Sequence, residues 1–222
     1  MVRATILFDF DSTIIKGESF ELMLTEKLTQ SPEVLAQITQ LTKMGMAGEI
    51  PFADSVKRRF GLVSPSLKDI DCFIDVALPG IITKGFQTLF KKLFALNIDI
   101  WIVSGGLKKL ILPFASYLAI EPEKVIALDG IWDEQGNFIE VIKNTSLISK
   151  IEATKPYQNK WQTPVIIVGD GYTDYQLKQS KIANYFICYT EHVQRDEVIA
   201  LADIAVSSAS ELEREILNKL AD

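Results

Sequence analysis

Short apolar runs that stop at acidic or small polar residues constrain the fold of this chain more than any other feature. Three such runs are Ala4–Phe8 before Asp9, Ile98–Val103 before Ser104, and Val165–Val168 before Gly169 and Asp170. Runs that are almost continuously apolar are typical of parallel strands, which are buried on both faces of their sheet. The polar residues that end these strands predict a ligand site at the carboxyl edge of the sheet.

Helical patterns alternate with these strands. Phe86, Leu89, Phe90, Leu93 and Phe94 follow the spacing of a helix that packs one face on a core. Further helices are predicted at 107–118 and 211–220, and further strands at Tyr185–Tyr189 and Ile204–Val206. This alternation predicts an α/β fold with a doubly wound, mostly parallel sheet and right-handed crossovers.

One segment interrupts the alternation. Residues 15–77 contain no clear strand, and four helices are predicted there: Glu18–Gln30, Pro32–Met44, Phe52–Phe60 and Leu67–Val76. We therefore expect a small helical cap at 15–77, inserted after the first strand of a core formed by 1–14 and 78–222. A β-hairpin is also predicted within Leu128–Ile139, around a turn that contains glycine.

Composition narrows the possible partners and cofactors. The chain has 222 residues and a formal charge of −6, which argues against a nucleic-acid partner. No apolar run is long enough to span a bilayer, so we expect a cytoplasmic protein without a membrane partner. Cys72 and Cys188 are too far apart in sequence for a C-x-x-C pair, and His192 is the only histidine. We interpret Cys188 as a core residue and His192 as a surface-helix residue without a partner.

Two acidic pairs follow strands. Asp9 and Asp11 are two residues apart, so in extended chain they face the same site. Asp170 ends a strand and Asp174 lies near the start of the next helix. Four carboxylates that meet at one edge repel each other unless a cation is bound, and oxygen ligands suit Mg²⁺. The alternative is that each pair only caps a helix or a turn.

Ser104-Gly105-Gly106 offers a complementary anion site. A hydroxyl and free backbone N–H groups at a helix start bind phosphate well, although an ordinary glycine-rich connection has the same sequence. A cation site beside an anion site is typical of phosphate chemistry, which also needs a lysine. Lys150 is the candidate, and Lys143 and Lys155 are the competitors.

Together these motifs resemble the haloacid-dehalogenase-like superfamily. Asp9-Phe10-Asp11-Ser12-Thr13 resembles its first motif, Ser104 its second, Lys150 its third, and Gly169 to Asp174 its fourth. They occur in the family's order along the whole chain. The inserted helices lie where members with a helical cap carry it.

Within that superfamily the chain most resembles the phosphoserine phosphatases. Glu18 stands nine residues after Asp9, where that family keeps a cap glutamate. The segment from Met46 to Phe52, followed by Arg59, resembles the part of the cap that lines the serine pocket. From residue type alone, Lys57-Arg58-Arg59 is a charge run, and such runs usually form a solvated face.

The resemblance implies a hydrolysis of phosphate monoesters through an aspartyl-phosphate. Asp9 would be the nucleophile and Asp11 the general acid and base. Mg²⁺ would be held by the carboxylates of Asp9 and Asp170 and the main-chain carbonyl of Asp11. The remaining implied roles are phosphoryl contacts by Ser104, Gly105, Lys150 and Thr173, orientation by Asp174, and substrate contacts in the cap by Glu18, Met46, Phe52 and Arg59.

Three alternatives remain open at this stage. The substrate could be another small phosphomonoester, or a second alcohol could accept the phosphoryl group instead of water. A receiver domain that is phosphorylated on aspartate also places acidic pairs at strand ends, but it has no cap. A catalytically inactive binding protein would not need the complete acidic set.

Overall fold

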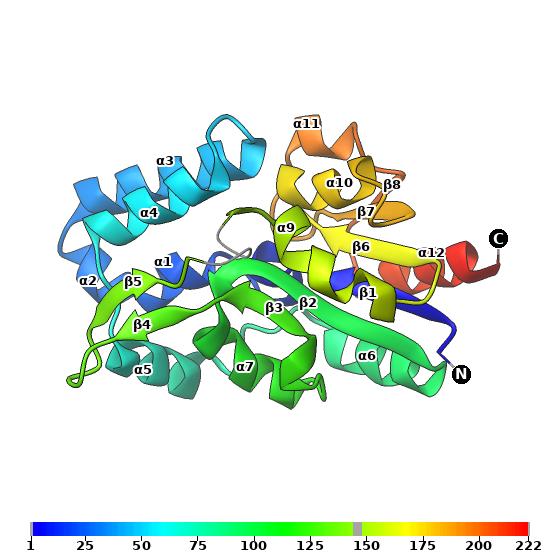
Figure 1. Cartoon of the computed structure of the whole chain (residues 1–222), viewed down its shortest axis with the longest axis horizontal. Coiled ribbons are helices and arrows are strands. Elements are labelled where there is room, and N and C mark those ends of the chain that lie inside the picture. Colours follow the sequence, from blue (N-terminus) through cyan, green and yellow to red (C-terminus); the bar gives the residue numbers. More distant parts are fainter. Residues whose placement is uncertain (1, 144–147, 222) are drawn as a thin grey trace.

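A six-stranded parallel sheet forms the centre of the computed structural model, which describes residues 2–143 and 148–221 (Figure 1). The strand order is β3-β2-β1-β6-β7-β8, and every neighbouring pair is parallel. The strands are β1 (Ala4–Phe8), β2 (Ile98–Leu107), β3 (Val125–Leu128), β6 (Val165–Gly169), β7 (Tyr185–Tyr189) and β8 (Ile204–Val206). The predicted doubly wound α/β fold is confirmed.

Helices cover both faces of this sheet, as the continuously apolar strands predict. In β1, Ile6 and Phe8 join one core cluster while Leu7 joins the other, because alternate side chains point to opposite faces. The helices of the first cluster are α6 (Phe86–Ala95), α7 (Lys108–Tyr117) and α12 (Ala209–Ala221). Those of the second cluster are α9 (Lys150–Thr154), α10 (Tyr172–Gln179) and α11 (Asp196–Ile199). Two short 3₁₀ helices, η2 (Pro122–Lys124) and η3 (Lys155–Lys160), complete the core.

Two strand predictions need correction. β3 was not predicted, because its four apolar residues run directly into the hairpin and resemble the hairpin's first strand. β2 was predicted to end at Val103 but continues through the Ser104-Gly105-Gly106 segment to Leu107, with a register shift against β3. Helix α7 therefore begins after that segment, at Lys108.

The inserted segment is helical, as predicted. Its helices are α1 (Ser19–Met23), α2 (Thr25–Thr29), α3 (Pro32–Ala47), α4 (Phe52–Leu62) and α5 (Leu67–Ala77). The single helix predicted over 18–30 is wrong, because the chain breaks at Leu24 into α1 and α2. In Figure 1, α3 and α4 lie side by side and project from the sheet, whereas α5 lies beside α7.

Aromatic contacts join the inserted helices to the rest of the molecule. Phe73 of α5 lies 6.1 Å from Phe114 of α7 between ring centroids, and Phe60 of α4 lies 4.6 Å from Phe138. Phe138 begins β5 (Phe138–Val141), which pairs antiparallel with β4 (Gly130–Trp132) in the predicted hairpin. These contacts place the hairpin against α4.

The sheet order fixes where ligands can bind. The chain moves outward from β1 through β2 to β3, and then returns to the other side of β1 with β6. Ligands of such sheets bind at this reversal, outside the carboxyl ends of the strands. Beyond β1 the chain turns through η1 (Phe10–Ile14), a π-helical turn in which Asp11 and Ser12 depart from helical geometry and Ser12 has a positive φ of 51°. Within the described part of the chain, no helix is both long and apolar enough to cross a membrane.

Candidate active site

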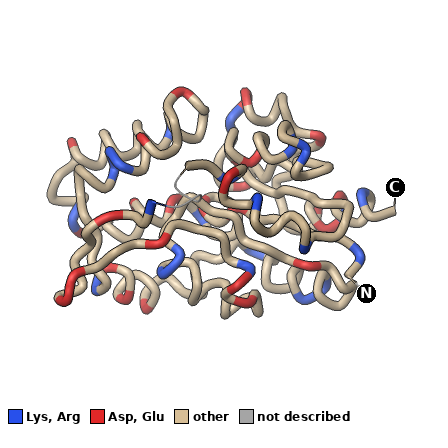
Figure 2. Tube along the Cα trace, viewed as in Figure 1, with Lys and Arg blue, Asp and Glu red and all other residues tan. Residues whose placement is uncertain are grey.

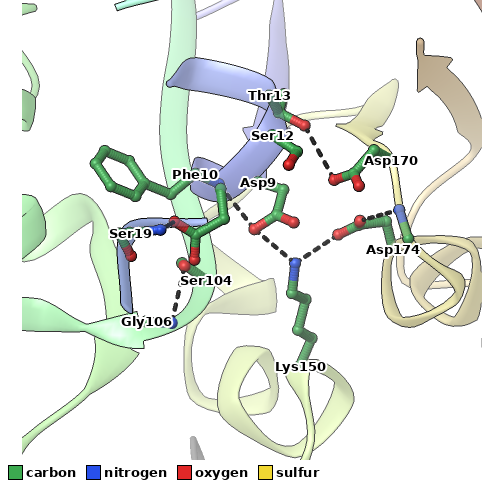
Figure 3. A network of polar contacts seen from close by, with 12 residues as sticks. Asp9, Phe10, Ser12, Thr13, Ser19, Ser104, Gly106, Lys150, Asp170 and Asp174 are labelled. Carbon is green, nitrogen blue, oxygen red and sulfur yellow. Dashed lines mark hydrogen bonds and ion pairs between the residues drawn. The ribbon is translucent and has the colours of Figure 1, made fainter. Parts of the chain in front are cut away.

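Asp9, Lys150 and Asp174 form a buried ion-pair network at the reversal of strand order (Figure 3). Asp9 follows β1, and its Oδ1 lies 2.8 Å from Nζ of Lys150, the first residue of α9. The same Nζ lies 2.6 Å from Oδ1 of Asp174, in the first turn of α10. Three separate segments of the sequence therefore meet at the ammonium group of Lys150.

The competing lysines lie elsewhere. The side chain of Lys150 is 6% exposed, whereas those of Lys143 and Lys155 are 82% and 58% exposed. Lys143 lies near Glu140 and Lys155 pairs with Glu152, each within its own segment. Burial lowers the pKa of Lys150, but Asp174 and Asp9 outweigh this effect and raise it above its usual value. Lys150 is therefore a fixed positive charge beside Asp9.

The carboxylates of Asp9, Asp170 and Asp174 lie close enough to share a cation. One ligand oxygen from each lies within 4.8 Å of the others. Asp174 uses Oδ1 on Lys150 and accepts a hydrogen bond from the Gly171 N–H at Oδ2 (3.1 Å). Oδ2 of Asp9 is buried and has no hydrogen-bond partner among the described residues. A buried carboxylate oxygen is stable when something binds it, so the donor set fits Mg²⁺ on Asp9 and Asp170.

Arg195 adds a second positive charge beside the three clustered carboxylates, and sequence reasoning missed it. Its Nη1 donates to the carboxylate of Asp170 and, at 3.1 Å, to the main-chain oxygen of the same residue. Arg195 lies in the loop between β7 and α11, far in sequence from every motif. No local pattern marks it, because the contact arises only when β7 pairs with β6.

Burial raises the pKa of four acids at this site. Desolvation, and then the charge of Asp9, raises the pKa of Asp11 to about 7, and desolvation followed by Asp11 raises that of Glu18 to about 8. For Asp170 and Asp174, desolvation is again the largest cause, and their pKa values rise to about 7 although Arg195 and Lys150 oppose it. Without a bound cation, the folded protein therefore holds protons that the unfolded chain would lose near pH 4.

The stability of the metal-free protein should consequently fall as pH rises from about 5 to 8. In that window the unfolded chain has lost these protons while the folded state still binds them. Each unit by which folding raises the pKa of an acid therefore lowers the free energy of unfolding by about 1.4 kcal/mol at high pH. The lowered pKa values of Asp69 and Asp133 act below this window. We expect Tm in EDTA to be lower at pH 8 than at pH 5.5, and Mg²⁺ to raise Tm more at pH 8.

Thermal unfolding by circular dichroism measures this effect. Glu18→Gln is the matching variant, because it removes one of these four acids and should flatten the slope of Tm against pH. A Tm in EDTA that stays constant or rises between pH 5.5 and 8 would contradict the electrostatic description of the site.

Asp11 faces a neighbouring pocket. Its Oδ1 accepts a hydrogen bond from the Ser19 N–H at the start of α1 (2.8 Å), which fixes its orientation. The same pocket is lined by four of the residues predicted for substrate binding in the cap, and by Gly105. The four cap residues are Glu18, Met46, Phe52 and Arg59.

Arg59 is buried and not on a solvated face. Lys57 and Arg58 are exposed, whereas Arg59 is 6% exposed and its guanidinium lies 5.5 Å from the centroid of the Phe20 ring. Its Nη1 donates to Oγ1 of Thr42 (3.3 Å), which in turn donates to Oε1 of Glu21 (2.6 Å). Sequence reasoning missed Thr42 and Glu21. The spacing of Glu21 from Glu18, one helical turn, could have indicated the latter.

The cap closely contacts the core around this pocket. A Cβ built on Gly105 would lie 2.5 Å from Cζ of Phe52, and one on Gly48 would lie 2.7 Å from Cδ1 of Tyr172. Glycine is required at Gly48 for a second reason, because it ends α3 with a φ of +77°. The pocket therefore lies between α3, α4 and the carboxyl edge of the sheet.

The structure of the predicted anion site differs from the sequence-based expectation in one respect. Ser104 and Gly105 belong to the extended end of β2 and not to a helix N-terminus. Ser104 Oγ accepts a hydrogen bond from the Gly106 N–H (3.0 Å), which turns the hydroxyl toward the glycine segment (Figure 3). Thr173, in the first turn of α10, has a buried Oγ1 without a hydrogen-bond partner in the described chain. Both hydroxyls remain candidates for phosphate contacts.

The prediction for His192 is wrong, and that for Cys188 is confirmed. His192 lies in the loop after β7 and not in a helix, and its Nε2 lies 2.7 Å from Oγ1 of Thr83. Because Thr83 donates its only hydroxyl proton to the Thr13 carbonyl (2.7 Å), His192 must donate to Thr83. His192 therefore supports the first-motif loop. Cys188 is buried in β7.

Comparisons with known proteins agree with this geometry. Residues 6–178 match the family described as haloacid dehalogenase-like hydrolase. The chain is 30% identical over 212 residues to the phosphoserine phosphatase of Drosophila melanogaster, covering 93% of this chain and 76% of that protein. It is 29% identical to the chloroplastic phosphoserine phosphatase of Arabidopsis thaliana, covering 89% of this chain and 66% of that protein.

Solved structures give the same result. A phosphoserine phosphohydrolase-like protein from Francisella tularensis superposes with a TM-score of 0.93 at 40% identity, covering 96% of this chain and 99% of that one. These matches confirm the resemblance and the prediction of a phosphoric monoester hydrolase. The chain therefore belongs to the haloacid dehalogenase-like hydrolases.

Proposed function

We propose that this enzyme hydrolyses L-phosphoserine with Mg²⁺ through an aspartyl-phosphate on Asp9. One juxtaposition carries the proposal: a buried Asp9–Lys150 pair lies beside a pocket that ends in the buried, charged Arg59. The first group suits a phosphoryl group and the second suits a carboxylate. The names of the Drosophila and Arabidopsis relatives support the same substrate.

Asp9 is the proposed nucleophile. Lys150 and the Phe10 N–H both bind its Oδ1, at 2.8 and 2.7 Å, and these two contacts fix the orientation of the carboxylate that would attack phosphorus. Covalent attack divides one difficult displacement into two easier ones. Asp174 holds Lys150 from the other side, so the ammonium can contact a phosphoryl oxygen while it stays in place.

The carboxylates of Asp9 and Asp170 and the main-chain carbonyl of Asp11 would hold Mg²⁺. When bound, the ion would reduce the repulsion between the carboxylate nucleophile and the phosphate dianion. Ser104, the Gly105 N–H and Thr173 would bind the other phosphoryl oxygens. The unpartnered hydroxyl of Thr173 supports its assignment.

Asp11 is the proposed acid and base. Burial, and then the charge of Asp9, raises the pKa of Asp11 toward neutrality in the metal-free protein, and a carboxyl in that range can give a proton to the leaving oxygen and then take one from water. Its hydrogen bond from Ser19 fixes the carboxyl at the boundary between the phosphoryl site and the pocket.

Glu18 and Arg59 would recognise the amino-acid part of the substrate. Arg59 provides a planar fork for the carboxylate, and Glu18 provides an acceptor for the ammonium. Glu18 accepts a hydrogen bond from Ser12 Oγ (2.8 Å), so its position is set before the substrate binds. Met46 and Phe52 would enclose the short carbon chain between the two ends.

A substrate panel tests this proposal. Initial rates would be measured on L-phosphoserine, other phosphomonoesters and an aryl phosphate, with Mg²⁺ and with chelator, and with and without acceptor alcohols. We expect the highest kcat/KM on L-phosphoserine, with water as acceptor and no activity after chelation. Full activity after exhaustive chelation would contradict the metal role. A better substrate without a carboxylate would contradict the specificity, and phosphorylated alcohols would indicate a transferase.

Arg59→Ala should reduce activity on L-phosphoserine selectively. The substitution leaves the substrate carboxylate unpaired in a closed site, which costs about 2 kcal/mol, or roughly thirtyfold in kcat/KM. Arg59→Lys should recover only part of this loss, because an ammonium has no bidentate fork. Hydrolysis of an aryl phosphate should change little. An equal loss on both substrates would mean that Arg59 supports the fold instead.

We also place the enzyme in the cytoplasm, with small phosphate esters as its partners and without a nucleic-acid or membrane partner. The charge of −6 argues against a nucleic-acid partner, and Figure 2 shows acidic residues interspersed with lysines and arginines along the described chain.

A further inference from the structure

Arg59 is held by two residues to which no role has been assigned. Thr42 of α3 accepts a hydrogen bond from Nη1 of Arg59 (3.3 Å) and donates to Oε1 of Glu21 in α1 (2.6 Å). Thr42 is 6% exposed, so this chain of hydrogen bonds is shielded from water. It joins three separate helices of the inserted segment, α1, α3 and α4.

The direction of these hydrogen bonds is fixed by chemistry. A threonine hydroxyl has one proton and can accept through its lone pairs, and a guanidinium can only donate. Thr42 must therefore give its proton to Glu21 and accept from Arg59. The carboxylate of Glu21 is thus linked through one hydroxyl to the guanidinium, and the described residues provide no direct ion pair for Arg59.

The contact also decides which edge of the guanidinium stays free. Nη1 lies on the side of the group away from the Nε–H, so a bond at Nη1 leaves the parallel donors of Nε and Nη2 unused. Nε of Arg59 is buried and has no partner among the described residues. A buried, unpaired donor on a residue that lines the pocket indicates a missing acceptor.

We propose that Thr42 and Glu21 are positioning residues that hold Arg59 with its Nε–Nη2 edge turned toward the substrate carboxylate. This inference rests on the proposed function, because it explains the orientation of the arginine that would bind that carboxylate. Preorganisation of this kind lowers the cost of binding, since the long side chain is already ordered when the substrate arrives. Specificity for a carboxylated phosphoester would then depend on the Glu21–Thr42–Arg59 chain and not on Arg59 alone.

The test compares Thr42→Val with Thr42→Ser. Valine keeps the shape but removes both hydrogen bonds, so kcat/KM for L-phosphoserine should fall about tenfold, mainly through a higher KM. Serine keeps the hydroxyl and should retain most of the activity. Hydrolysis of phenyl phosphate should stay within about twofold for both variants, because that substrate has no carboxylate. Glu21→Ala should show the same selective loss as Thr42→Val.

Ser55→Ala is the matched control. Ser55 of α4 donates to the Leu41 carbonyl of α3 (2.8 Å), so this variant removes a buried link between the same two helices without touching Arg59. It should not change the preference for L-phosphoserine. If Ser55→Ala and Thr42→Val lower the preference equally, Thr42 acts by supporting the cap and the proposal is wrong.

A double-mutant cycle separates this inference from the proposed function. In the Arg59→Ala background, Thr42→Val should cause no further loss on L-phosphoserine, because there is no guanidinium left to position. A full loss in that background overturns the positioning role while the substrate assignment stands. If Arg59→Ala itself shows no selectivity between the two substrates, the carboxylate assignment fails and the positioning role fails with it.

Discussion

Asp9→Asn should lose at least about 10⁴-fold in kcat on L-phosphoserine, because an amide is a poor nucleophile and no second residue replaces it. The substitution is isosteric, and Lys150 keeps its ion pair with Asp174, so the fold should persist. Steady-state rates with saturating substrate and Mg²⁺ measure the effect.

Asp54→Asn is the matched control for this variant, since Asp54 is exposed on α4 and should tolerate the change. Near-normal turnover in Asp9→Asn, at a Tm close to that of the wild type, would move the nucleophile to another acid.

Asp11→Asn should lower kcat by about 10²- to 10⁴-fold, the usual contribution of a general acid and base. Asparagine can still accept from the Ser19 N–H, so the loop should keep its shape, but it cannot exchange a proton with the leaving oxygen or with water. Both formation and breakdown of the covalent intermediate should slow.

Leaving-group dependence identifies the acid role. Aryl phosphates with acidic phenols need little protonation, so Asp11→Asn should form the intermediate from them much faster than from L-phosphoserine. Rapid-quench measurements of the first turnover show this difference. An equal slowing on both kinds of ester would mean that Asp11 has no role as an acid.

The sequence predicted the sheet well because its strands are buried on both faces. Such strands need continuous apolar runs, and β1, β6 and β7 stand out from the polar residues around them. β3 is equally apolar but has only four residues and continues into a hairpin, so periodicity could not separate the two. Packing against β2 decides its place.

In the candidate site, too, some features could be predicted from the sequence and others depend on tertiary packing. Asp9, Asp11, Asp170 and Asp174 follow strands, so strand prediction alone brings them to one edge. Lys150 was chosen ahead of Lys143 and Lys155 because phosphate chemistry needs a lysine, and the resemblance then supported that choice. The structure then placed it within 2.8 Å of Asp9. Its burial could not be predicted from the sequence, because it depends on how α9 packs.

Arg195 and Thr42 could not be found in advance, whereas the spacing of Glu21 from Glu18 gave at most an indication of Glu21. Arg195 contacts Asp170 from the loop after the neighbouring strand β7, 25 residues further along the chain. Thr42 lies in the middle of α3, where a threonine is usually interpreted as a helix-surface residue. Their roles come from contacts between elements, which motifs and periodicity do not describe.

The most direct test of the mechanism is to identify the residue that carries the phosphoryl group during turnover. Wild-type enzyme would be mixed with radiolabelled L-phosphoserine and Mg²⁺, quenched in acid and digested, and the labelled peptide would be identified by mass spectrometry. We predict acid-stable, base-labile label on Asp9, absent from Asp9→Asn. Label on a different residue, or rapid turnover without any covalent label, would contradict the account.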